Sequence, residues 1–117
     1  MSFSLKDAAK TFSWPVDIQV PLKDGKFKKK SFVAEFEILS SEEMDAESET
    51  DGTNQADVVF CKKIVVGWDS KTISDEDGAP LEFSDDALNS LLQIPYVRVG
   101  VGRAYFSAMK GRARVKN

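Results

Sequence analysis

Residues 83–109, FSDDALNSLLQIPYVRVGVGRAYFSAM, decide the fold of this chain. Apolar side chains recur along the whole segment, and no acidic residue interrupts them after Asp86. Ser84 followed by Asp85 is typical of a helix start, because a serine side chain accepts hydrogen bonds from free backbone amides and a carboxylate favours the positive end of the helix dipole. The segment therefore predicts a short helix over residues 84–92, with leucines on its inner face.

The part of this segment after Pro95 fits two kinds of secondary structure. Valines alternate with other residues over positions 97–102, as in a strand, but the apolar residues also share one face of a helix. Pro95 suits the first turn of a helix and Gly111 suits its end. We predict a helix over residues 96–110, in which Gly100 and Gly102 each cost about 1 kcal/mol relative to Ala but permit close packing. Its inner face comprises Val97, Val101, Ala104, Tyr105 and Ala108.

The N-terminal half predicts an antiparallel β-hairpin. Apolar and polar residues alternate over residues 16–20, and the prolines on either side favour an edge strand. Asp24-Gly25 is a pair that tight turns require, since glycine accepts a positive φ. The return strand, residues 27–39, begins with a lysine cluster at 26–30 that is typical of a protected edge. The inner face of this return strand comprises Phe32, Ala34, Phe36 and Ile38.

Between the two halves the composition changes sharply. Seven acidic residues and no basic residue occur over positions 40–57, where Ser41 suits the start of a short helix. We predict a flexible acidic loop at residues 45–55, because this composition buries too little apolar surface to order itself. Residues 56–68 predict a helix, although the β-branched run at 64–66 also suits a strand. Residues 69–81 predict a loop with a turn.

Length and composition indicate one domain over residues 1–117. The predicted elements make it α+β, with an N-terminal antiparallel β-hairpin packed with a C-terminal group of three to four α-helices. No apolar run is long enough to span a membrane and the N-terminus lacks a secretory signal, so we expect a cytoplasmic location. Cys61 is the single cysteine and there is no histidine, which removes the usual zinc sites and Ser-His or Cys-His pairs. The acidic segments match no calcium loop. We expect no enzyme activity, metal or cofactor.

Charge is sorted along the chain. Residues 1–86 hold 10 Lys or Arg and 19 Asp or Glu, a net charge of −9, whereas residues 87–117 hold six basic residues and no acid. Opposite charges on different parts of one chain favour heterologous contacts, in which two different surfaces of neighbouring copies meet. Such contacts close into rings or grow into helical assemblies. The alternative is a small nucleic-acid-binding regulatory protein that uses the basic residues 26–30 and the C-terminal segment; the acidic pI near 5.0 disfavours it.

Seven short segments, in this order, carry a resemblance to a known family. They are residues 11–16 (TFSWPV), 32–36 (FVAEF), 66–68 (VGW), 75–78 (DEDG), 81–84 (LEFS), 94–98 (IPYVR) and 103–106 (RAYF). Together they resemble the tail assembly chaperones of long-tailed bacteriophages and their prophage relatives. The chain departs from that pattern at Gly100 and Gly102 and in the acidic insert at 45–54.

The resemblance implies a non-enzymatic helper of tail morphogenesis in the bacterial host cytoplasm, absent from the mature virion. Such a chaperone binds the long, helical tape measure protein, keeps it soluble, helps recruit tail tube protein and associates with copies of itself. Tyr and Arg most often anchor protein interfaces. The expected partner-binding residues are therefore Tyr96, Arg98, Arg103, Tyr105 and Phe106.

Overall fold

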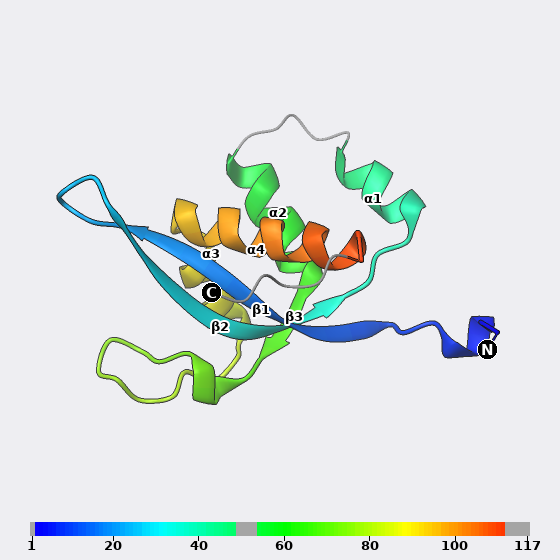
Figure 1. Ribbon diagram of the computed structural model, residues 1–117, viewed down its shortest axis with the longest axis horizontal. Helices are drawn as coiled ribbons and strands as arrows, with labels where there is room; N and C mark the ends of the chain where they lie inside the picture. The colour runs from blue at the N-terminus through cyan, green and yellow to red at the C-terminus, as the bar shows by residue number, and fades with distance from the viewer. Residues whose placement is uncertain (1, 49–53, 112–117) are drawn as a thin grey trace.

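The computed structural model describes residues 2–48 and 54–111, which form an antiparallel sheet flanked by helices (Figure 1). The predicted α+β fold, an N-terminal antiparallel hairpin with a group of three to four α-helices, is confirmed for these residues, which form a three-stranded sheet and four α-helices. The elements in order are the 3-10 turn η1 (Leu5–Asp7), β1 (Thr11–Pro21), β2 (Phe27–Glu37), α1 (Ser41–Ser48), α2 (Asn54–Ile64), β3 (Val65–Trp68), the 3-10 turn η2 (Ser70–Thr72), α3 (Asp85–Leu92) and α4 (Pro95–Met109).

The β1–β2 hairpin turns at the predicted place. Gly25 has a φ of 81°, and the Leu22 amide donates to the Lys26 carbonyl at 2.8 Å. The sheet order β1-β2-β3 leaves β1 at an edge, as its two prolines indicate. Buried side chains alternate along both strands, so one face of the hairpin faces the core. These side chains are Val16, Ile18, Phe32, Ala34 and Phe36, whereas Ile38 lies beyond the end of β2 and is half-buried.

The single helix predicted over residues 56–68 is wrong in its last four residues. Helix α2 ends at Ile64, and the next four residues form β3, which pairs antiparallel with β2. The β-branched side chains at 64–66 favour the extended conformation, and β2 offers an unpaired edge that satisfies the backbone of β3. Gly67 lies opposite Glu35, and a Cβ at Gly67 would stand 3.2 Å from the Glu35 carboxylate. The strand was the alternative that the sequence left open.

The predicted start of α3 is confirmed. The Ser84 hydroxyl accepts a hydrogen bond from the Ala87 amide at 3.0 Å, with Asp85 and Asp86 in the first turn. Leu88 and Leu92 are buried on its inner face. Only Gln93 and Ile94 separate Leu92 from Pro95, where α4 begins.

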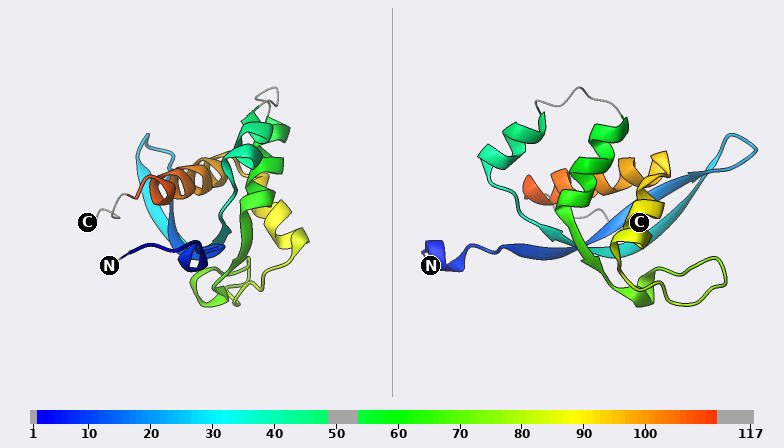
Figure 2. Two further views of the ribbon diagram at one scale, coloured as in Figure 1. Left: turned by 90° about the vertical axis from the view of Figure 1, so that its right-hand side faces the viewer. Right: turned by 180° about the vertical axis from the view of Figure 1, so that it is seen from behind.

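Residues 97–102 are helical, so the structure decides between the two readings of that segment in favour of the helix. Gly111, at a φ of 71°, follows the end of α4, as predicted. The inner face of α4 packs on β1, and Gly100 lies where a Cβ would stand 2.7 Å from the Asp17 carbonyl oxygen. Figure 2 shows α4 lying between the hairpin on one side and α2 on the other.

More of the acidic segment is helical than its composition predicts. Residues 45–48 belong to α1 and residues 54–55 to α2, so the predicted loop at 45–55 is helical at both of its ends. The remaining part of that loop, residues 49–53, lies outside the described residues. Helix α1 begins with a reciprocal pair of hydrogen bonds: the Ser40 amide donates to the Glu43 carboxylate at 3.0 Å, and the Glu43 amide donates to the Ser40 hydroxyl at 3.2 Å.

Residues 69–81 form the predicted turn-containing loop. Asp75 accepts hydrogen bonds from the amides of Asp77 and Ala79, so its carboxylate stabilises the turn itself. The Trp68 indole donates to the Leu81 carbonyl at 2.7 Å and ties the two ends of the loop together.

Two segments project from opposite ends of the molecule, whose extents are 49 × 35 × 29 Å (Figure 1). The tip of the β1–β2 hairpin forms one end. The N-terminal arm, residues 2–10, extends at the other end.

Candidate protein-binding groove

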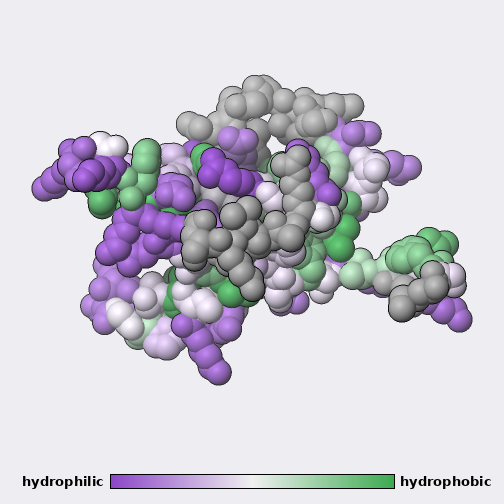
Figure 3. Space-filling view, in the orientation of Figure 1, coloured by the Kyte–Doolittle hydropathy of each residue, from purple (hydrophilic) through white to green (hydrophobic). Residues whose placement is uncertain are grey.

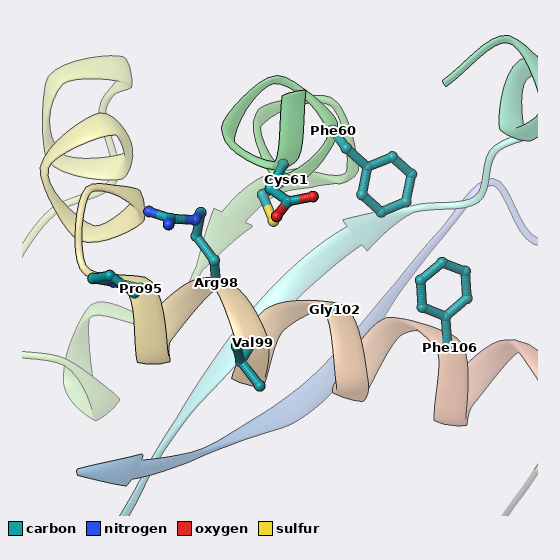
Figure 4. Close-up of a pocket in the computed structure, with 8 residues that line it drawn as sticks. Phe60, Cys61, Pro95, Arg98, Val99, Gly102 and Phe106 are labelled. Carbon is teal, nitrogen blue, oxygen red and sulfur yellow. The ribbon is translucent and has the colours of Figure 1, made fainter. Parts of the chain in front are cut away.

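Helices α2 and α4 enclose a surface groove of about 300 Å³ (Figure 4). It forms because α4 lies with its inner face on the sheet and α2 meets only one flank of α4. The side chains that remain between the two helices are apolar, apart from one carboxylate and one guanidinium. The groove is lined by Asp57, Phe60, Cys61, Pro95, Arg98, Val99, Gly102 and Phe106.

An aromatic pair forms one end of the groove. The rings of Phe60 on α2 and Phe106 on α4 are stacked, with centroids 5.9 Å apart and planes within 6° of parallel. Figure 4 shows the two rings next to each other in the space between the helices. Phe106 is still 42% exposed, so the pair presents aromatic surface to the outside as well as joining α2 to α4.

Helix α4 also carries an outer apolar stripe. Val99 is 57% exposed, and Gly102, Phe106 and Met109 follow it at intervals of three, four and three residues. This is the spacing at which one helix meets another in a coiled coil, and over ten residues it extends for about 15 Å. The inner face of α4 is a different face of the helix, and it is already buried against the rest of the protein. Its buried residues are Val97, Gly100, Val101, Ala104 and Tyr105.

The side chain of Arg98 lines the groove and contacts the end of α3. Its guanidinium donates a hydrogen bond of 2.6 Å to the Leu92 carbonyl at the end of α3. A cation at this place satisfies a free carbonyl of the last helical turn and favours the negative end of the α3 dipole. Arg98 therefore links α3 to α4.

Cys61 lies buried at the floor of the groove. The pKa of its thiol is raised to about 11, chiefly by burial and also by the negative charge of Asp57, while the positive charge of Arg98 opposes the shift. The thiol thus stays protonated near neutral pH, and a protonated thiol is neither a nucleophile nor a metal ligand. We interpret Cys61 as a small apolar side chain of the groove floor.

The expected partner-binding residues have different environments. Arg98 and Phe106 line the groove, and Arg103 is exposed on α4 outside its lining. Tyr96 is half-buried and packs against the core. Tyr105 is fully buried, where its hydroxyl accepts a hydrogen bond from the Leu39 amide at 3.0 Å, so it has no surface to offer a partner in this structure.

Sequence reasoning did not find the other groove residues. The outer stripe of α4 follows from the sequence once residues 96–110 are taken as a helix, because Val99 and Phe106 are seven residues apart. Phe60 could not be found in this way, since it comes from α2, and no spacing along the chain brings residue 60 beside residue 106.

The two basic segments of the sequence are separated in space. Lys26, Lys28, Lys29 and Lys30 lie on the projecting hairpin and are exposed. Lys110 is the C-cap of α4, and the basic residues Arg112, Arg114 and Lys116 lie outside the described residues.

Within residues 2–48 and 54–111, no group of three or more His, Cys, Asp or Glu side chains is arranged to hold a metal ion. In the same part of the chain, none of the helices combines the length and apolar character needed to cross a membrane.

Comparison of the chain with models of protein families, with curated proteins and with solved structures gives no match.

Proposed function

We propose that this chain is a non-enzymatic tail assembly chaperone of a long-tailed phage or prophage, and that the α2–α4 groove binds a helical segment of the tape measure protein. The proposal places it in the host cytoplasm, where it keeps the tape measure protein soluble and helps recruit tail tube protein, and outside the mature virion. The observation that carries it is the outer stripe of α4 beside the Phe60–Phe106 pair.

The stripe suits a helical partner for geometric reasons. Val99, Gly102, Phe106 and Met109 occupy positions equivalent to a and d of two heptads. A Cβ added to Gly102 would meet no heavy atom within 4 Å, which leaves space for a client side chain against the backbone of α4. An amphipathic helix that lies in such a groove buries its own apolar face, as helix-in-groove recognition requires.

The charges beside the groove suit the flanks of such a helix. Asp57 is exposed on the α2 side, and Arg103 is exposed on the α4 side next to Gly102. In paired helices the residues that flank the apolar seam carry charges that set orientation. A client helix with a basic residue toward Asp57 and an acidic residue toward Arg103 fits this arrangement.

The test is co-purification of the chain with the tape measure protein encoded beside it, comparing two exposed valines. Val99→Asp places a carboxylate in the groove, whereas Val59→Asp makes the same change on the exposed side of α2 outside the groove lining. We expect Val99→Asp to weaken client binding at least about tenfold, as loss of a central apolar contact does, and Val59→Asp to leave it unchanged.

Two results would count against the proposal. Equal retention of the tape measure protein by both valine variants would show that the groove is not the binding site. A wild-type chain that neither retains the tape measure protein nor improves its solubility on co-expression would remove the chaperone function itself. Arg103→Glu supplies an independent check, with a smaller loss that increases as the salt concentration falls.

A further inference from the structure

The N-terminal arm, residues 2–10, exposes two large apolar side chains that stand clear of the core. Phe3 is 75% exposed and Leu5 is 90% exposed. Neither belongs to the core cluster or packs against it, and Figure 3 shows the arm as a largely apolar projection at the right-hand edge. Water disfavours exposed apolar surface of this size. A nearby apolar surface that covered the two side chains would therefore stabilise the arm in a second position.

The base of the arm lies at the aromatic end of the α2–α4 groove. The Phe12 ring, two residues after the arm, lies 6.1 Å from the Tyr105 ring between centroids. The Tyr105 ring in turn lies 5.8 Å from the ring of Phe106 and 6.2 Å from the ring of Phe60. Phe60 and Phe106 are the stacked pair at that end of the groove. Two ring contacts thus connect the base of the arm to the groove.

The arm has the length and the side-chain spacing to lie along the groove. From Leu5 to Thr11 the chain spans roughly 15 Å even when η1 keeps its 3-10 turn. In an extended chain, Phe3 and Leu5 point to the same side and are about 6.6 Å apart. On α4, Gly102 and Phe106 share one face and are about 6 Å apart. Leu5 against the Phe106 ring therefore brings Phe3 over Gly102, where an added Cβ would meet no heavy atom within 4 Å.

Charge suits the same arrangement. Asp57 is the one carboxylate among the described residues that line the groove, and it is exposed. It lies three residues before Phe60, about one helical turn from the aromatic end. Lys6 is exposed and directly follows Leu5, so an arm that lies in the groove carries a positive charge to that end. Opposite charges this close attract, although solvent and salt weaken the effect.

We propose that the arm is a displaceable cover of the α2–α4 groove: without a client, Phe3 and Leu5 lie on Gly102 and Phe106, and a client helix displaces them. The short tether makes this contact intramolecular, with an effective concentration on the order of mM. The structure shows the open position, in which the arm extends away and the groove is uncovered. The closed position removes the apolar side chains of both arm and groove from water until a client arrives.

The cover deepens the proposed function, since competition between arm and client rests on the proposal that the groove is the client site. The contact between arm and groove does not rest on it. That contact is measured on the protein alone, whereas client binding needs the tape measure protein. The two proposals can therefore fail separately.

Disulfide trapping tests the closed position without any client. Every variant carries Cys61→Ala, so that the introduced cysteines are the only thiols. The groove pair is Ser2→Cys with Val99→Cys, which joins the end of the arm to the groove position one turn before Gly102. The control pair is Ser2→Cys with Val59→Cys, an exposed valine of α2 outside the groove lining. A disulfide needs the two Cα atoms within about 7 Å, and denaturing gels separate an internal disulfide from one between copies.

We expect the groove pair to form an internal disulfide at least about tenfold faster than the control pair. Phe3→Ser with Leu5→Ser keeps the tether but removes the apolar contacts, so it should slow the groove pair to the rate of the control pair. Leu22→Ser with Phe27→Ser makes the same changes on the exposed hairpin tip and should leave the rate unchanged.

The same serine variants, with the native Cys61 and no added cysteine, test the competition. Phe3→Ser with Leu5→Ser should bind the tape measure protein at least about threefold more tightly than the wild type, as expected when the arm covers the groove more than about two-thirds of the time. The hairpin control should bind it as the wild type does. Circular dichroism confirms that each variant is folded.

Several outcomes would overturn the cover. These are equal rates for the groove and control pairs, a groove pair that the arm serines do not slow, and a disulfide that forms only between copies. Weaker client binding by the arm variant would also overturn it, because the arm would then be part of the client site. Rapid trapping of the groove pair in a chain that does not bind the tape measure protein would support the arm contact and overturn the proposed function.

Discussion

Gly100 and Gly102 provide a matched pair for testing how α4 packs on the sheet. Both are glycines within one helix, two residues apart. An ideal Cβ on Gly100 would stand 2.7 Å from the Asp17 carbonyl oxygen and 3.4 Å from an Ile18 side-chain carbon, whereas a Cβ on Gly102 meets nothing within 4 Å. Real Cβ atoms essentially never approach another heavy atom as closely as 2.7 Å, so Gly100→Ala must move α4 away from β1.

The expected magnitudes follow from two opposing effects. Ala is favoured over Gly in a helix interior by about 1 kcal/mol, and both variants gain this. Overpacking a well-packed contact costs roughly 1–3 kcal/mol, and only Gly100→Ala incurs it, because the obstacle is backbone and cannot rotate away. Gly102→Ala should therefore stabilise the protein by about 1 kcal/mol, and Gly100→Ala should be less stable than Gly102→Ala by roughly 1–3 kcal/mol.

Urea unfolding followed by tryptophan fluorescence and by circular dichroism measures both variants against the wild type, and coincidence of the two signals establishes the two-state behaviour that the comparison needs. If Gly100→Ala unfolds at the same urea concentration as Gly102→Ala, the close approach of α4 to Asp17 does not exist in solution, and the reasoning fails.

Three further predictions concern single contacts. Tyr105→Phe removes the hydroxyl that accepts from the buried Leu39 amide, so the free energy of unfolding should fall by about 1–3 kcal/mol in urea titrations; an unchanged midpoint would show that water or another group satisfies that amide. Cys61 has a pKa raised from 9.0 to about 11 in the folded state, so the unfolded chain loses its thiol proton first and stability should fall as pH rises from 9 toward 11. Unfolding measured across that range should show a shallower decline in Cys61→Ala, and identical slopes would refute the assignment. Ser84→Ala removes the N-cap of α3 and should cost about 0.5–2 kcal/mol in thermal unfolding, whereas Ser90→Ala on the exposed side of the same helix serves as the control and should change little; equal effects would argue against the cap.

The elements with local signals were predictable from the sequence. Asp24-Gly25 fixes the hairpin turn because only a residue tolerant of positive φ fits it, and Ser84 marks the start of α3 because its hydroxyl has backbone amides to accept from. The helix over residues 96–110 was correct for a similar reason, since Pro95 and Gly111 delimit it.

The division of residues 56–68 was not predictable in the same way. Up to Ile64 the spacing of apolar residues is helical, and Val65 continues that pattern, so nothing local requires the helix to end. It ends because β2 has an open edge and a short β-branched segment pairs with it, which is a property of two segments about 30 residues apart.

The candidate groove depended still more on tertiary structure. The sequence indicated Arg98, Arg103, Tyr105 and Phe106 as residue types common at interfaces, yet their environments separate them into a helix-linking side chain, an exposed charge, a buried hydrogen-bond acceptor and a groove residue. Residue type does not report burial, and burial separates these roles.

By itself, the amino-acid sequence determined the α+β class, the hairpin turn, the ends of α3 and α4 and the sorting of charge along the chain, because each depends on neighbouring residues or on composition. Only the tertiary structure decided that the inner face of α4 packs on β1, that β3 completes the sheet, and that Phe60 lies beside Phe106. Those features join segments distant in the sequence, and their physical cause is packing against partners that no local pattern specifies.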